Sequence, residues 1–387
     1  MIKMKTLKKC GILAELLFLI CSFCIPCGAA EPTAQNDFID FVENSAQELW
    51  EEELKQNLPQ NAKGLLEQGK VDSFSNLLSM NPKELFSFLQ ETLIQKRNAP
   101  FALLARLAGM ILLCAALNTL QKTGVSSQMK EIFSVTAAVC IASLLSEPIL
   151  DCIQRTVEAL RQSAVFTMSF APVMSGIMIA GGNPTSAGVY HMVLFFCSEI
   201  LSELAAQTLI PLLNIYLALC LVSPLAPFLQ IGKITTVIKR VVCWGLGILA
   251  TVFVGILSLQ TVIGNGGDSL VMKTSKFVVS SMIPIIGSTI SEALGAAKSC
   301  VHLLKGVVGS IGILAAVLTF LPVLLEVGIW YCMVHAVAWL GAILDIGEVS
   351  EILSCVAQTF SILLAIVCSF MLMFLVSTTL ILTVTAR

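Results

Sequence analysis

Long apolar stretches alternate with short polar segments along the chain from Phe101 onward. A transmembrane helix needs about twenty predominantly apolar residues. The pattern predicts ten candidate spans, at 101–120, 132–150, 164–182, 190–209, 210–228, 241–263, 277–296, 306–325, 327–345 and 357–384. Two of them, 164–182 and 277–296, are interrupted by proline and small residues, and as re-entrant segments they would leave eight spans. We therefore predict an all-α polytopic membrane protein with about 8–10 transmembrane helices.

Composition agrees with a membrane protein. Of the 387 residues, 56% are hydrophobic and 12% are charged, whereas soluble domains carry about 25% charged residues. The net charge is only −2, and no basic stretch typical of a nucleic-acid-binding protein is present. The expected surroundings are the lipid bilayer and other membrane proteins, with no nucleic acid as a partner.

The first thirty residues have the three parts of a secretory signal peptide: a lysine-rich start, an apolar stretch and the small residues "CGAA" ending at Ala30. Cleavage would expose residues 31–99, which contain twelve acidic and six basic residues. The alternative is a first helix that is retained. With cleavage, we expect 31–99 to be extracytoplasmic and 100–387 to form the polytopic membrane domain.

The acidic region 31–99 has the pattern of amphipathic helices. A capping sequence at Asn81 precedes an apolar face that includes Leu85, Phe88 and Leu89. A region of this size with few large apolar residues has a marginal core of its own. Its apolar face would be covered by the membrane surface or by a partner protein, and a solvated helical spacer is the alternative.

Two proline-containing segments suggest an internal repeat. "SFAPVM" at 169–174 and "SMIPII" at 281–286 share a Ser-x-x-Pro pattern at an offset of 112 residues, which divides the core into possible halves at 101–210 and 211–325. Interrupted segments at matching places in two halves are typical of a binding site or pore, and ordinary kinks in packed helices are the alternative. The candidate pore or broken-helix positions are Pro172, Gly176, Gly181, Gly182, Pro284 and Gly287.

Ionisable residues within apolar segments are expensive, so each is a candidate functional residue. His191, Glu199 and Glu203 fall on roughly one face of a predicted helix and could relay protons or attract a cation. The alternative is an interfacial position with both carboxylates in water. Arg106 and Glu326 are isolated within apolar stretches, and pairing of Arg106 with a glutamate is possible.

No catalytic or cofactor chemistry is indicated. The chain has no nucleophile–base arrangement, phosphate loop or dinucleotide fingerprint, and "GNGGDS" at 264–269 is typical of a turn. The cysteines outside the signal peptide lie singly, mostly in apolar segments, where they act as small packing residues. We predict no cofactor, no metal and no enzymatic activity.

The segments "QIGKITTVIKRVVCWGLGILATVFVGILSLQ" (230–260) and "VMKTSKFVVSSMIPIIGSTISEALGAAKS" (271–299) resemble the stage III sporulation protein AE family. The plan of a signal peptide, an acidic exported region and a polytopic domain is similar too, so the resemblance covers nearly the whole chain. It implies a protein of endospore-forming bacteria, made in the mother cell and working in the membrane around the forespore. With other proteins of its operon and a forespore membrane protein, such a protein would form a channel or secretion-like complex supporting late forespore development.

Two functional hypotheses remain. The first is a non-enzymatic membrane subunit of a multiprotein sporulation channel, and the exported region 31–99 favours it. The second is a stand-alone secondary transporter or exporter of a small solute, which the possible repeat and the interrupted segments favour.

Overall fold

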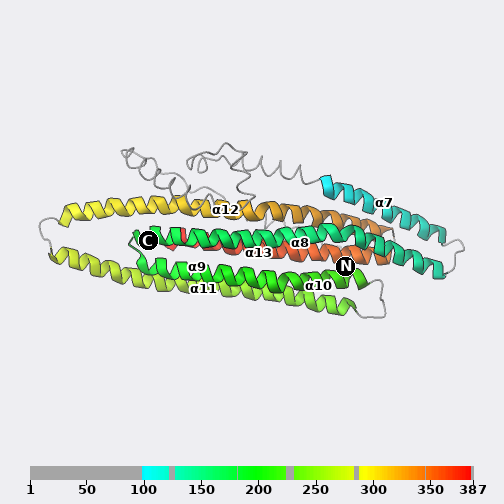
Figure 1. Ribbon diagram of the computed structural model, residues 1–387, viewed down its shortest axis with the longest axis horizontal. Coiled ribbons are helices and arrows are strands. Elements are labelled where there is room, and N and C mark those ends of the chain that lie inside the picture. Colours follow the sequence, from blue (N-terminus) through cyan, green and yellow to red (C-terminus); the bar gives the residue numbers. More distant parts are fainter. Residues whose placement is uncertain are drawn as a thin grey trace. The chain divides into compact units, whose positions relative to one another are not determined.

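The computed structural model describes residues 98–384, apart from 122–126, 181, 224–230, 283–286 and 345. The predicted signal peptide lies outside these residues, and so does the acidic region except for its last two positions. The described chain is helical, with no strand among its residues. The helices are α7 (Asn98–Gln121), α8 (Ser127–Ala180), α9 (Pro184–Leu204), α10 (Ile210–Val222), α11 (Ile231–Met282), α12 (Gly287–Ile343) and α13 (Gly347–Val384) (Figure 1). The predicted all-α class is confirmed.

Five long apolar stretches within these helices could cross a membrane. They are Val135–Ala180, Ser202–Val222, Gly232–Gln260, Val308–Ile343 and Val349–Thr379. A shorter apolar helix, Pro100–Ala116, belongs to α7. These stretches fit a multi-pass membrane protein.

Several spans that the sequence pattern separates belong to single helices. The predicted spans 132–150 and 164–182 both lie in α8, and 306–325 and 327–345 both lie in α12. The polar stretch 151–163 contains neither glycine nor proline, and most of its residues from Gln154 to Gln162 favour a helix, so polarity alone does not produce a turn there. The described residues therefore contain fewer and longer elements than ten separate spans.

The end of α8 explains the cluster of glycine and proline at 181–184. The helix continues through Pro172 and ends in a C-terminal capping motif: Asn183 N–H donates to Met178 O (3.0 Å) and Gly182 N–H donates to Ile179 O (2.9 Å). Gly182 has φ 79°, the left-handed conformation that this motif requires and glycine tolerates best. Pro184 then begins α9, where a missing N–H has no cost.

We expect Gly182→Ala to lower the stability of this turn by about 1 kcal/mol, because a Cβ is unfavourable in the left-handed region. The matched control is Gly188→Ala in α9, where an added Cβ meets nothing within 4 Å. Thermal denaturation of the detergent-solubilised protein measures both variants. An equal or higher midpoint for Gly182→Ala than for Gly188→Ala would contradict the capping role.

A π-helical turn at Ala205–Leu209 joins α9 to α10, so the predicted boundary at 209–210 is not a loop. Pro211, in the first turn of α10, lacks an N–H and crowds the preceding carbonyl groups. The wider turn accommodates the proline without ending the helix. The predicted span 190–209 and the first part of 210–228 therefore form one continuous helical element.

The core is built around α13, which packs against α8, α10, α11 and α12 (Figure 1). Phe166 and Phe170 of α8 stack with ring centroids 5.5 Å apart, and Phe374 of α13 lies 6.0 Å from Phe166. Gly312 of α12 is buried beside them. A Cβ at this glycine would lie 2.7 Å from Phe170 Cζ, so α12 approaches its neighbours closely only because the position is glycine.

Candidate functional site

A polar cavity of about 590 Å³ lies where α10, α11 and α13 meet. Each of these helices has an end nearby, because α10 ends at Val222, α11 begins at Ile231 and α13 begins at Gly347. The cavity is lined by Tyr216, Gly232, Thr235, Thr236, Lys239, Arg240, Cys243, Glu351, Ser354, Cys355 and Gln358.

Gln358 connects the three helices at this cavity. Its Oε1 accepts a hydrogen bond from Lys239 Nζ of α11 (2.9 Å) and one from the Tyr216 hydroxyl of α10 (3.4 Å). Tyr216 is buried, so its hydroxyl requires such a partner. Gln358 thereby fixes the ammonium of Lys239 at the cavity wall.

The charges around the cavity have both signs. Lys239 and Arg240 come from successive positions of α11, and Glu351 comes from the first two turns of α13. The side chains of Thr235 and Thr236 donate to the carbonyl of Gly232, which turns their hydroxyls toward their own helix. This set of groups can bind a ligand that carries an anion and a cation.

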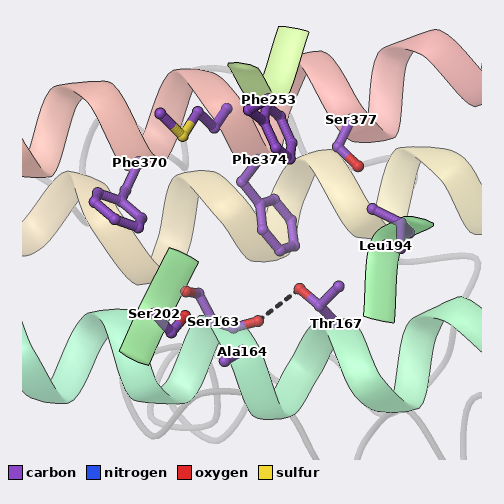
Figure 2. A pocket seen from close by; sticks show the side chains of 10 residues that line it. Ser163, Ala164, Thr167, Leu194, Ser202, Phe253, Phe370, Phe374 and Ser377 are labelled. Atoms are coloured by element: carbon purple, nitrogen blue, oxygen red, sulfur yellow. Dashed lines mark hydrogen bonds between the residues drawn. The ribbon is translucent and has the colours of Figure 1, made fainter. Parts of the chain in front are cut away.

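A second, much smaller cavity lies deeper in the bundle, between α8, α9, α11 and α13 (Figure 2). Its volume is about 40 Å³, which is room for only a few water molecules. Thr167 donates to the carbonyl of Ser163, and Ser163 donates to the carbonyl of Leu160. Phe253, Phe370 and Phe374 close the cavity on the opposite side (Figure 2). It is too small for an organic solute.

Glu326 pairs with Arg155. Arg155 Nε of α8 lies 3.4 Å from Glu326 Oε1 of α12, and Arg155 Nη1 donates to Glu326 Oε2 (3.5 Å). The Glu326 side chain is 12% exposed and that of Arg155 is 51% exposed. The pair joins α8 to α12, and its arginine lies in the polar stretch 151–163 of α8. Arg106, the partner considered from the sequence, is exposed on α7.

Glu199 and Glu203 are both exposed on α9. Glu203 accepts a hydrogen bond from Gln207 one turn later, and His191 stacks on Phe195 with ring centroids 6.5 Å apart. No group of three or more His, Cys, Asp or Glu able to hold a metal occurs among the described residues. A transport role for this face stays a prediction.

The interrupted segments are placed only in part. Pro172 and Gly176 lie within the continuous helix α8, Gly182 forms the turn, and Gly287 begins α12. Gly181 and Pro284 lie outside the described residues. That these positions line a pore, and that the core contains two similar halves, both stay predictions.

Comparison with known proteins decides the family. The chain matches the family description "Stage III sporulation protein AE" over residues 68–385. The chain belongs to the stage III sporulation protein AE family. It is 23% identical to the stage III sporulation protein AE of Bacillus subtilis (strain 168) over 288 residues, which are 73% of this chain and 71% of the relative. No solved structure matches. The resemblance seen in the sequence is confirmed, and the chain is a sporulation-related membrane protein.

In this member of the stage III sporulation protein AE family, sequence reasoning missed the polar cavity. Lys239 and Arg240 look like loop charges that set orientation, and Glu351 looks like a solvated loop residue. Gln358 gives no signal in the sequence, because it lies 119 residues from the lysine it binds. The only hint is a glutamate and a glutamine placed seven residues apart at the start of an otherwise apolar stretch.

Proposed function

We propose that this protein is a non-enzymatic membrane subunit of a channel or secretion-like complex that links mother cell and forespore and supports late forespore development. It would reside in the mother-cell membrane around the forespore, with residues 31–99 extracytoplasmic. Other sporulation membrane proteins would be its partners. Family membership supports the sporulation role, and the resemblance stated above suggests the complex.

The observation that carries the subunit role is the length of the helices. α11 has 52 residues and α12 has 57, or about 80 Å each at 1.5 Å per residue, against a hydrocarbon core of about 30 Å. The sequence of α11 beyond Ile263 includes Asn265, Asp268, Lys273 and Lys276, which are costly in hydrocarbon. Part of α11 therefore extends beyond the bilayer, where it is available to a partner.

The stand-alone transporter finds less support in the described residues. The cavity between α8, α9, α11 and α13 holds about 40 Å³, whereas small-molecule sites measure about 300–1,000 Å³. Secondary transporters bind their substrates near the middle of the bilayer. The larger polar cavity lies in the outer part of the apolar stretches and not at their middle.

The test is affinity capture of the full chain from sporulating cells. We expect wild type to retain other sporulation membrane proteins, and Lys273→Glu/Lys276→Glu to retain about tenfold less, the loss expected when about 1.4 kcal/mol of binding free energy disappears. The matched control is Lys122→Glu/Lys130→Glu, a basic pair elsewhere in the sequence. We expect the spore count of each variant to fall in step with the amount of partner protein that it retains.

Two results would count against the subunit role. One is capture of no sporulation membrane protein by wild type at normal protein level. The other is solute uptake by vesicles that contain the purified chain alone, which would favour the transporter.

A further inference from the structure

The polar cavity continues into an apolar groove on α11. The groove measures about 360 Å³ and is lined by Cys243, Trp244, Gly247, Ile248, Thr251 and Val252. Cys243 lines both hollows, so they adjoin at that residue. Trp244 is 72% exposed, and Ile248 and Val252 are each half exposed. An added Cβ at Gly247 meets nothing within 4 Å, so this glycine leaves the groove open.

The two hollows lie at different depths of the apolar stretches. On α11 the cavity is lined from Gly232 to Cys243 and the groove from Cys243 to Val252, while Tyr216 lies six residues before the end of Ser202–Val222 and Glu351 two residues after the start of Val349–Thr379. The groove runs inward from Cys243 to Val252, about 14 Å along the helix. That is close to half of a 30 Å hydrocarbon core, or one leaflet.

The chemistry of each hollow matches one part of an amphiphile. Lys239 and Arg240 supply two cations, and arginine in particular binds phosphate with paired N–H donors. Basic pockets between membrane helices bind phosphorylated lipid headgroups. Glu351 adds a carboxylate to the same cavity, which suits a headgroup that also carries an ammonium group. The groove offers an apolar lining for an acyl chain.

We propose that this protein binds a phospholipid at the junction of α10, α11 and α13. The phosphate lies at Lys239 and Arg240, the headgroup ammonium faces Glu351, and one acyl chain follows the groove at Gly247. Phosphatidylethanolamine has this combination of charges. The site rests on the membrane placement of the helices and not on the channel role, so either proposal can fail without the other.

The test uses the full chain, purified in detergent, with equimolar phosphatidylethanolamine that carries a photoreactive diazirine in one acyl chain. Peptide mapping after illumination should place most crosslinks in residues 243–252. Unlabelled phosphatidylethanolamine should compete better than phosphatidylglycerol. Free phosphoethanolamine should compete weakly, because it lacks the acyl chain that the groove holds.

Variants separate the parts of the site. Lys239→Gln/Arg240→Gln should reduce crosslinking about tenfold or more, since each cation near a headgroup contributes about 1 kcal/mol. The control is Lys233→Gln, because Lys233 is exposed on α11 and does not line the cavity. Glu351→Gln should remove the preference for phosphatidylethanolamine over phosphatidylglycerol.

Gly247→Leu should fill the groove and abolish the crosslink. Gly255→Leu is its control, because Gly255 also lies in open space on α11 but outside the groove. Elution of each variant as a single species in gel filtration shows that it is folded.

Three outcomes would overturn the proposal. Crosslinks spread evenly over the exposed apolar faces would show that lipid contacts the protein without a specific site. Competition by phosphoethanolamine as strong as by the lipid would identify a soluble phosphate compound as the ligand. Lipid adducts that are absent from residues 243–252 would mean that the groove holds no acyl chain.

Discussion

Gly312→Ala is expected to lower the thermal stability of the protein markedly, although the same change elsewhere in a helix usually raises it. The new Cβ would lie 2.7 Å from Phe170 Cζ and 3.0 Å from Thr378 Cγ2. Both neighbours belong to the packed core, so the ring or the helices must shift. Overpacking of this kind costs about 1–3 kcal/mol, and Gly312→Leu should prevent folding altogether.

The matched control is Gly328→Ala on the same helix, where the nearest side-chain atom, Leu364 Cδ1, lies at 3.8 Å. This contact is ordinary, so the gain in helix propensity, up to about 1 kcal/mol, should dominate. Phe170→Leu combined with Gly312→Ala should recover part of the loss, because it removes the clashing ring atoms. Fluorescence-detected gel filtration after heating measures all of these variants, and equal midpoints for the two alanine variants would refute the close-packing argument.

Replacing Arg155 of the Arg155–Glu326 pair is expected to have the second large effect on the stability of the protein. Arg155→Met should destabilise the protein by about 1–3 kcal/mol, since Glu326 would keep a largely desolvated carboxylate without its guanidinium partner. The loss falls below the 3–5 kcal/mol typical of fully buried pairs, because Arg155 is half exposed. Arg161→Met is the control, because Arg161 is exposed on the same helix.

The double variant Arg155→Met/Glu326→Leu tests the origin of that loss. Removing both charges leaves no desolvated carboxylate, so most of the stability should return. Thermal denaturation of the four proteins completes a double-mutant cycle. If the double variant is as unstable as the sum of the two single variants, the pair contributes nothing beyond packing.

The sequence was sufficient for the class of fold and for the family, since both depend on properties that extend over long segments. Apolar stretches define membrane helices whatever their partners are, and the resemblance covers residues 230–260 and 271–299. Helix boundaries were harder to predict. The polar stretch 151–163 looks like a loop between two spans, yet most of its residues from Gln154 to Gln162 favour a helix, and α8 runs through it. Gly182 marks the end of α8, because the capping turn requires a positive φ. Pro172 does not end the helix, because proline removes one backbone hydrogen bond and the helix continues past it.

The candidate site could not be predicted, because its contacts are distant in sequence. Lys239 meets Gln358 across 119 residues, and Arg155 meets Glu326 across 171. Each of these residues by itself looks like an isolated polar position. The packing of α10, α11 and α13 places Lys239 and Gln358 at one cavity, and the packing of α8 against α12 brings Arg155 to Glu326.

The uninterrupted course of α8 has a mechanical consequence. A helix of 54 residues is a rod about 80 Å long, so a tilt of about five degrees at one end moves the other end by about 7 Å. Pro148 and Pro172 each remove one backbone hydrogen bond, which makes their neighbourhoods the softest parts of the rod. We therefore expect α8 to bend near Pro148 and Pro172, while the segments on either side of each proline move as rigid rods.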